Sequence, residues 1–202
     1  MLLSAPEIAD EMRRKRIRIE PFVPSLLRRA SYTLRLGNCS RRWKRAEKPI
    51  LMWSKDASLG HLEDITNSTR ILISQGDFIL ASTKESITLP DNIAGLICTL
   101  SHVARFGLTA TAGSLLVRPG FGHDKATSLT LELASLNPSP LEFPIGLPIC
   151  HLAFLRLSQP IVTGVKSVYE NFGVPCPPML YEDLSETIEK LDGGENNLEM
   201  GQ

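Results

Sequence analysis

The sequence predicts a mostly-β protein, a distorted β-barrel or β-sandwich with one short helix at its N-terminus. Short apolar runs recur along the chain, and Gly, Pro and Asn turns separate them. Little of the chain has helical periodicity. A chain of 202 residues with 43% hydrophobic content can bury a full core, although its length alone would also permit two small domains. We therefore expect one domain over residues 1–175 and an acidic, flexible tail over residues 176–202.

Local patterns place the elements of this fold. Ser4 can cap a helix that runs to about Lys15, because Ile8 and Met12 stand one turn apart on its apolar side. The polar stretch from Cys39 to Thr69 predicts an irregular excursion, and the tail can form one helix near Leu184–Leu191. Alternating or apolar patterns predict strands at Ile17–Ile19, Ser31–Leu36, Ile71–Ile73, Phe78–Ser82, Ser86–Leu89, Ile93–Thr99, Ser114–Val117, Leu129–Leu133 and Ile149–Leu157.

Charge is segregated along the chain, although 22 basic and 22 acidic residues give a formal net charge of zero. Basic runs such as Arg13–Arg16 and Arg28-Arg29 dominate residues 1–50, and carboxylates dominate the chain from Glu170 onward. The two ends can attract each other, and the basic end would also attract a nucleotide triphosphate. We expect no nucleic-acid partner, because the basic runs are short and no nucleic-acid motif accompanies them.

Composition also bears on the compartment. No run approaches the roughly 18 apolar residues of a membrane span, so we expect no membrane partner. The four cysteines lack a Cys-x-x-Cys spacing, which favours reduced thiols. These features predict a protein of the cytoplasm, with the nucleus as the alternative.

The stretch from Thr99 to Leu133 holds the strongest candidate for a chemical site. Alternation in its last strand places Leu129, Leu131 and Leu133 on one face and Glu132 on the other. A carboxylate on a rigid strand, opposite a segment that carries Ser101 and Arg105, is a candidate general base beside its positioning groups. The alternative is an ordinary exposed glutamate on a strand.

Other chemistries lack their signatures in this sequence. A zinc-dependent base deaminase needs His-x-Glu and Pro-Cys-x-x-Cys, and neither occurs. The scattered histidines suggest no metal site, and neither a Gly-x-Ser-x-Gly elbow nor a strand, glycine-rich turn and helix unit is present. We therefore expect no protein-bound metal.

Several strings resemble the dCTP deaminase branch of the dUTPase superfamily, in order and in approximate spacing. They are Leu89–Gly95, Ser101–Leu108, Thr111-Ala112-Gly113, Pro119-Gly120-Phe121 and Leu129–Leu133. The resemblance covers residues 1 to about 175 and implies the dUTPase-like fold. It also implies a homotrimer with active sites at subunit boundaries. The implied reaction is metal-free hydrolysis of dCTP to dUTP and ammonia, with Mg²⁺ bound only through the nucleotide phosphates.

The resemblance also implies roles for individual residues. Glu132 would be the general base and acid, and Ser101 and Arg105 would orient the attacking water and stabilise developing charge. The main chain at Thr111, Ala112 and Gly113 would read the pyrimidine. The remaining candidates for substrate binding are Arg118, His151 and Tyr169, of which Tyr169 would close over the nucleotide and His151 would bind phosphate or be structural.

Three departures from the family pattern leave the activity open. Leu100 and Val168 stand where the family has basic residues, and Arg118 stands where it has an aspartate. These changes favour an alternative, a catalytically degenerate nucleotide-binding or regulatory protein. A weaker alternative is a dUTP pyrophosphatase, which depends on the aspartate that Arg118 displaces. Either Arg118 or the N-terminal arginines could replace the missing phosphate ligands.

Overall fold

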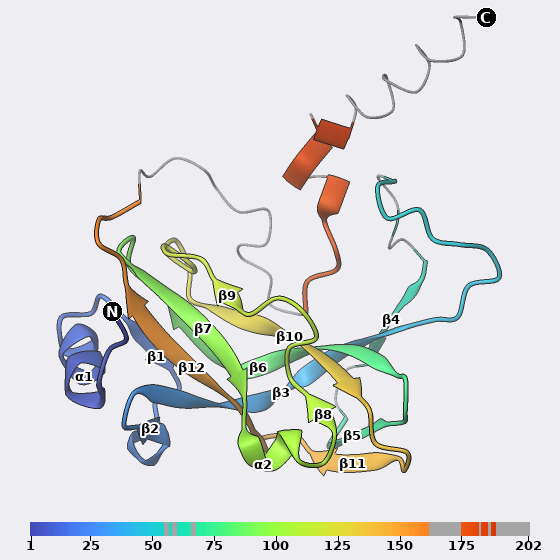
Figure 1. Ribbon diagram of the computed structural model, residues 1–202, viewed down its shortest axis with the longest axis horizontal. Helices are drawn as coiled ribbons and strands as arrows, with labels where there is room; N and C mark the ends of the chain where they lie inside the picture. The colour runs from blue at the N-terminus through green and yellow to red at the C-terminus, as the bar shows by residue number, and fades with distance from the viewer. Residues whose placement is uncertain are drawn as a thin grey trace, which may run out of the picture.

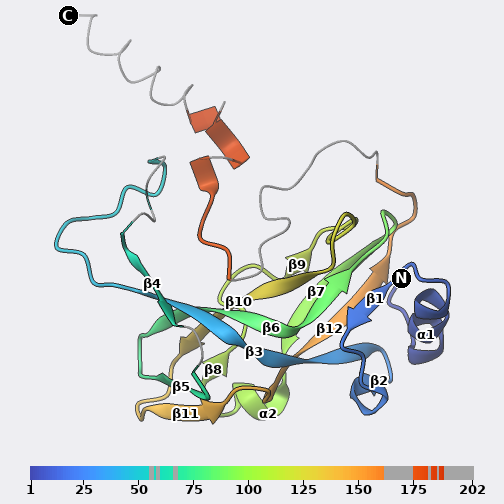
Figure 2. The ribbon, with the colours of Figure 1, turned by 180° about the vertical axis from the view of Figure 1, so that it is seen from behind.

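The protein is mostly β in a computed structural model, which describes residues 1–54, 57, 60–65, 68–161, 175–181, 183–185 and 187–188. Figure 1 shows a curled antiparallel sheet, and Figure 2 shows it from behind, with the N-terminal helix α1 at one side. The elements of this described part are α1 (Ala5–Arg13), β1 (Arg18–Glu20), the 3-10 turn η1 (Pro24–Leu26), β2 (Leu27–Arg28), β3 (Ser31–Trp43), β4 (Leu62–Ile65), β5 (Arg70–Ile73), β6 (Phe78–Thr88), β7 (Ile93–Thr99), α2 (Ser101–Ala104), β8 (Leu108–Thr109), β9 (Leu116–Val117), β10 (Thr127–Ser135), β11 (Leu141–Pro144) and β12 (Pro148–Arg156).

Ten of these strands form one sheet in the order β8-β10-β6-β3-β12-β7-β9, with β1 on β6 and with β2 and β4 on β3. Strands β5 and β11 form a separate pair. The predicted fold class, a distorted barrel of mostly β structure with a short N-terminal helix, is confirmed. Strand β10 lies between β6 and β8, so Glu132 stands within the sheet and not at its edge.

Strand β3 joins the two halves of the curled sheet. Its first half pairs with β12 from Tyr32 to Arg35, and its second half pairs with β6 and β4. The two backbones come so close at Gly37 that a Cβ there would lie 2.3 Å from the Ser82 hydroxyl oxygen. Only glycine fits this crossing.

The prediction of an irregular excursion from Cys39 to Thr69 is wrong at both of its ends. Strand β3 continues to Trp43, and β4 returns beside it in register with Ser40–Trp43. The cross-strand ion pair between Arg41 Nε and Asp64 Oδ1, at 2.6 Å, helps to hold these polar strands together. Strand β6 likewise runs unbroken from Phe78 to Thr88, where two strands were predicted.

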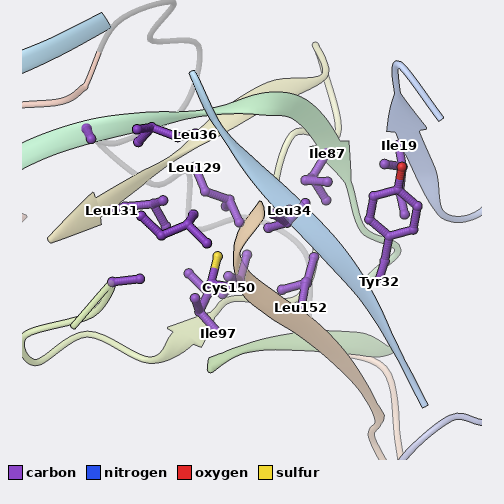
Figure 3. Close-up of a cluster of buried hydrophobic side chains, with 14 of the residues drawn as sticks. Ile19, Tyr32, Leu34, Leu36, Ile87, Ile97, Leu129, Leu131, Cys150 and Leu152 are labelled. Atoms are coloured by element: carbon purple, nitrogen blue, oxygen red, sulfur yellow. The ribbon is translucent and has the colours of Figure 1, made fainter. Parts of the chain in front are cut away.

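The core fills the inside of the curled sheet. Strand β10 alternates between buried and half-buried residues over its whole length, and Leu131 and Leu133 are fully buried. Figure 3 shows Leu129 and Leu131 with Leu34, Cys150 and Leu152, which come from β3 and β12. Burying one such leucine stabilises the fold by about 1.5–3 kcal/mol.

The predicted N-terminal helix is confirmed, with its cap. The Glu7 carboxylate accepts hydrogen bonds from the Ser4 amide at 2.8 Å and from the Ser4 hydroxyl at 2.7 Å. These bonds lower the pKa of Glu7, the amide having the larger effect. Ile8 is fully buried on the inner side of α1, so this helix packs against the sheet.

The beginning of the C-terminal segment contacts the sheet. The amide of Cys176 donates a hydrogen bond of 3.0 Å to the Thr130 hydroxyl on β10, and Cys176 and Ile188 are buried. Residues 180–181, 183–185 and 187–188 are helical. The two-part division at residue 175 stays a prediction. Among the described residues, no helix is long and apolar enough to span a membrane, and the predicted compartment stays a prediction.

Candidate active site

Strand β10 holds Glu132 in a fixed position on the face opposite the core leucines. Its amide donates a hydrogen bond of 3.1 Å to the carbonyl oxygen of Ala110. One carboxylate oxygen, Oε2, accepts hydrogen bonds from the amides of Gly113 at 2.8 Å and of Ser114 at 3.1 Å. Within the described part of the chain, no donor reaches the other oxygen, Oε1. The carboxylate is thus oriented by main chain at one oxygen and open at the other.

The segment that orients Glu132 is itself anchored. The Thr99 hydroxyl accepts a hydrogen bond of 2.9 Å from the Ala110 amide, and the Thr109 hydroxyl donates one of 2.8 Å to the Thr111 carbonyl. The structure therefore brings the predicted base together with the main chain of Thr111–Gly113. Side-chain hydroxyls thus help to fix the turn whose Gly113 amide donates to Glu132. The reading of a pyrimidine by this main chain stays a prediction.

The predicted water-orienting residues lie at the two ends of α2, Ser101 as its first residue and Arg105 as its C-cap. This helix begins after Leu100, whose amide is bonded to the Ile149 carbonyl at 3.1 Å, and the Arg105 amide caps its end on the Ser101 carbonyl at 3.1 Å. Ser101 and Arg105 are exposed. No described contact joins either side chain to Glu132.

A pocket of about 840 Å³ opens beside α2. Ser101 and His151 both line it, so the structure brings these two predicted site residues together. His151 Nδ1 lies 3.3 Å from the Thr33 hydroxyl. Burial first, and the charge of Arg28 second, lower the pKa of His151. Glu132 does not line this pocket, so one copy of the chain presents the predicted site in two separate parts.

One further predicted site residue, Arg118, lies elsewhere. Arg118 is 3.7 Å from the carboxylate of Asp183, in the C-terminal segment, and is not in the pocket beside α2. Tyr169 falls outside the described residues, as does Val168.

Sequence reasoning did not place Arg28, Arg29 and Thr33 at a site, yet all three line the pocket beside α2. By sequence, the paired arginines are included only among the N-terminal basic residues that could replace missing phosphate ligands. Their position directly before an alternating strand was the available signal, because a turn at a strand end is a common place for ligand-binding side chains.

The curled antiparallel sheet with its short N-terminal helix has a dUTPase-like fold. The chain belongs to the dCTP deaminase-like family, whose model matches residues 2–157. A dUMP-forming dCTP deaminase of Nocardioides sp. is 31% identical over 93% of this chain and 99% of its own length. That of Methanospirillum hungatei is 34% identical over 76% of this chain and 80% of its own.

A solved structure supports the fold independently. The 2'-deoxycytidine 5'-triphosphate deaminase of Agrobacterium tumefaciens superposes with a TM-score of 0.57 at 18% identity, over 76% of this chain. The match spans 47% of that longer chain. At this identity the likeness shows a shared fold.

Proposed function

We propose that this protein is a dCTP deaminase that hydrolyses the 4-amino group of the cytosine ring. The observation that carries the proposal is the state of Glu132, fixed at Oε2 by two main-chain amides and reached at Oε1 by no donor of the described residues. A general base needs such a lone pair at a defined position. Family membership and the names of the relatives support the substrate.

In the proposed reaction, Glu132 Oε1 removes a proton from a water molecule as its oxygen attacks C4. The new C–O bond gives a tetrahedral centre, and Glu132 returns the proton to the amino nitrogen. The C–N bond then breaks and ammonia leaves. The remaining hydroxyl proton passes to N3 as the C4 carbonyl forms, so dCTP and water become dUTP and ammonia. The magnesium ion enters with the triphosphate as part of the substrate.

The site would be completed between copies of the chain in a homotrimer. Ser101 and Arg105 of a neighbouring copy would orient the water and stabilise the charge that develops at C4. Support comes from the separation of Glu132 from the pocket that holds Ser101, and from exposed apolar surface next to α2. Phe106 is 63% exposed and Leu136 is 77% exposed. The Asn137 side chain donates a hydrogen bond of 2.9 Å to the Phe106 carbonyl. Leu136 directly precedes Asn137, so Phe106 and Leu136 belong to one exposed patch.

A second candidate product is dUMP, because the relatives are named dUMP-forming. This product requires hydrolysis of the bond between the α- and β-phosphates and releases pyrophosphate. Arg118, in place of the family's aspartate, weighs against it.

Turnover by the purified full chain tests the proposal. With dCTP and Mg²⁺, we expect one ammonia for each dCTP consumed, dUTP as product and no pyrophosphate. If one pyrophosphate and one dUMP form for each dCTP consumed, the product is dUMP and not dUTP. Absence of ammonia, with dCTP binding retained in calorimetry, would support the catalytically degenerate alternative and overturn the deaminase.

A further inference from the structure

The pocket beside α2 has a one-sided charge. Arg28 and Arg29 stand at the tight turn between β2 and β3, and His102 and His151 approach from α2 and β12. None of the described residues that line it is an aspartate or glutamate. Clefts lined by one sign of charge concentrate ligands of the opposite sign.

Within the described residues, neither arginine has a carboxylate partner of the kind that neutralises other arginines of this chain. Arg28 Nε is 3.4 Å from the Thr33 hydroxyl, and no described acceptor reaches its two terminal nitrogens. Arg29 has no side-chain partner within the described part of the chain. In contrast, Arg16 and Arg156 lie within 2.7 Å of the buried Glu11 carboxylate in a second pocket of about 370 Å³.

The turn that carries the arginines is anchored. Arg28 pairs with Ser31 across the hairpin, and the Arg29 carbonyl accepts a hydrogen bond of 2.7 Å from the Ala5 amide at the start of α1. The guanidinium groups therefore extend from a fixed backbone, which reduces the entropy lost on binding. The planar donor pattern of arginine suits bidentate contact with phosphate oxygens.

We propose that Arg28 and Arg29 bind the polyphosphate of the nucleotide in this pocket. Leu100, which also lines the pocket, contributes no charge, so the arginines of the β2–β3 turn supply its positive charge. This assignment rests on the proposed function for the identity of the nucleotide, but the anion site itself does not depend on turnover. The pocket volume lies within the range of small-molecule sites, about 300–1,000 Å³.

Calorimetry with inorganic tripolyphosphate, dCTP and deoxycytidine tests the assignment. Arg28→Ala and Arg29→Ala should each weaken tripolyphosphate and dCTP binding about tenfold, with deoxycytidine binding unchanged. Arg18→Ala is the matched control, since Arg18 is an exposed arginine on β1 outside the pocket and should leave all affinities unchanged. Added to the double variant Arg28→Ala,Arg29→Ala, Leu100→Arg should restore part of the affinity, because position 100 also lines the pocket.

The outcomes separate this assignment from the proposed function. If the wild type releases ammonia from dCTP and Arg28→Ala,Arg29→Ala binds tripolyphosphate like the wild type, the arginine site is wrong and the deaminase stands. If the wild type releases no ammonia but binds tripolyphosphate, and the double variant has lost this binding, the site stands and the deaminase is wrong. Equal losses for deoxycytidine and tripolyphosphate would show general disruption of the pocket and would also overturn the assignment.

Discussion

Arg118 Nη2 lies 3.7 Å from Oδ2 of Asp183, so the C-terminal segment reaches the loop that follows β9. The Arg118 side chain is 59% exposed, and such an ion pair contributes little to stability. It does give Arg118 a partner that an anionic ligand would have to replace. Arg118 lies outside the basic N-terminal residues 1–50, so the expected attraction between the two ends of the chain stays a prediction.

A first prediction concerns the replacement of Asp183 by a bound triphosphate as the partner of Arg118. If Arg118 reaches the triphosphate on binding, Arg118→Ala should weaken dCTP affinity about tenfold, because one charge-assisted hydrogen bond is lost. Asp183→Asn should tighten binding, since the arginine no longer has to leave a carboxylate. Calorimetry with Mg²⁺ and dCTP measures both. Equal affinity in wild type, Arg118→Ala, Arg118→Asp and Asp183→Asn would place Arg118 outside the site.

The second prediction isolates the proposed base. Glu132→Gln should abolish ammonia release while nucleotide binding and thermal stability stay close to wild type. The glutamine oxygen can still accept from the Gly113 and Ser114 amides, but its amide group cannot take a proton from water. Glu142→Gln, at an exposed glutamate paired with Arg70, is the control and should remain active. Ammonia release by the Glu132 variant would remove Glu132 from the mechanism.

The third prediction is that the protein assembles as a trimer in solution. Light scattering should give about three times the chain mass of 22.3 kDa at micromolar concentration. Phe106→Glu should yield a folded monomer without activity, because a charge would be buried in the contact next to α2. The exposed Leu72, 56% accessible on β5, provides a control in Leu72→Glu. A stable wild-type monomer with full activity would contradict the shared site.

Sequence patterns were sufficient where burial is local and periodic. The alternation of Leu129, Leu131 and Leu133 set both the core face of β10 and the outward direction of Glu132. Patterns were insufficient at the second half of β3, where Arg41 and Arg42 look like loop residues. Their strand is held by pairing with β4 and by ion pairs with Asp64 and Asp77, and such distant partners leave no local periodicity.

The candidate site shows the same division. The motif around Glu132 and Gly113 could be predicted, because both belong to one family-like segment. The pocket beside α2 joins Arg28 to His151, and only the pairing of β3 with β12 brings these distant positions together. Isolated basic residues carry no periodic signal, so neither the pocket nor its charge could be inferred from spacing alone.

A fourth prediction concerns fold stability and the buried pair of Arg35 and Glu85. Glu85 is fully buried, and its carboxylate accepts hydrogen bonds from Arg35 Nε at 2.6 Å and from the Arg35 amide at 2.8 Å. Glu85→Ala should therefore lower the free energy of unfolding by about 3–5 kcal/mol, because it leaves a buried guanidinium unpaired. Denaturant titration measures the loss. Glu63→Ala, at an exposed position on β4, should change it by less than about 0.5 kcal/mol. If Glu85→Ala changes the free energy of unfolding as little as Glu63→Ala does, water must replace the hydrogen bonds that Glu85 gives Arg35.

The fifth prediction uses the pH response of His151. Burial, and then the charge of Arg28, lower its pKa from the ordinary value of 6.5, and Arg29 and His102 also line its pocket. Below that value the unfolded chain binds the proton more readily than the folded one. Stability is therefore complete above pH 6.5 and declines as the pH falls toward the lowered pKa. His151→Gln should flatten this part of the stability profile in denaturant titrations at different pH values.

A bound polyphosphate should reverse the shift, since its negative charge favours the imidazolium ion. Binding at pH 6 should then take up a proton, which calorimetry detects as a heat that depends on the ionisation enthalpy of the buffer. His151→Gln should remove this uptake, and His123→Gln, at an exposed histidine outside the pocket, should retain it. Buffer-independent heats for the wild type, with tripolyphosphate bound, would mean that the anion does not sit beside His151.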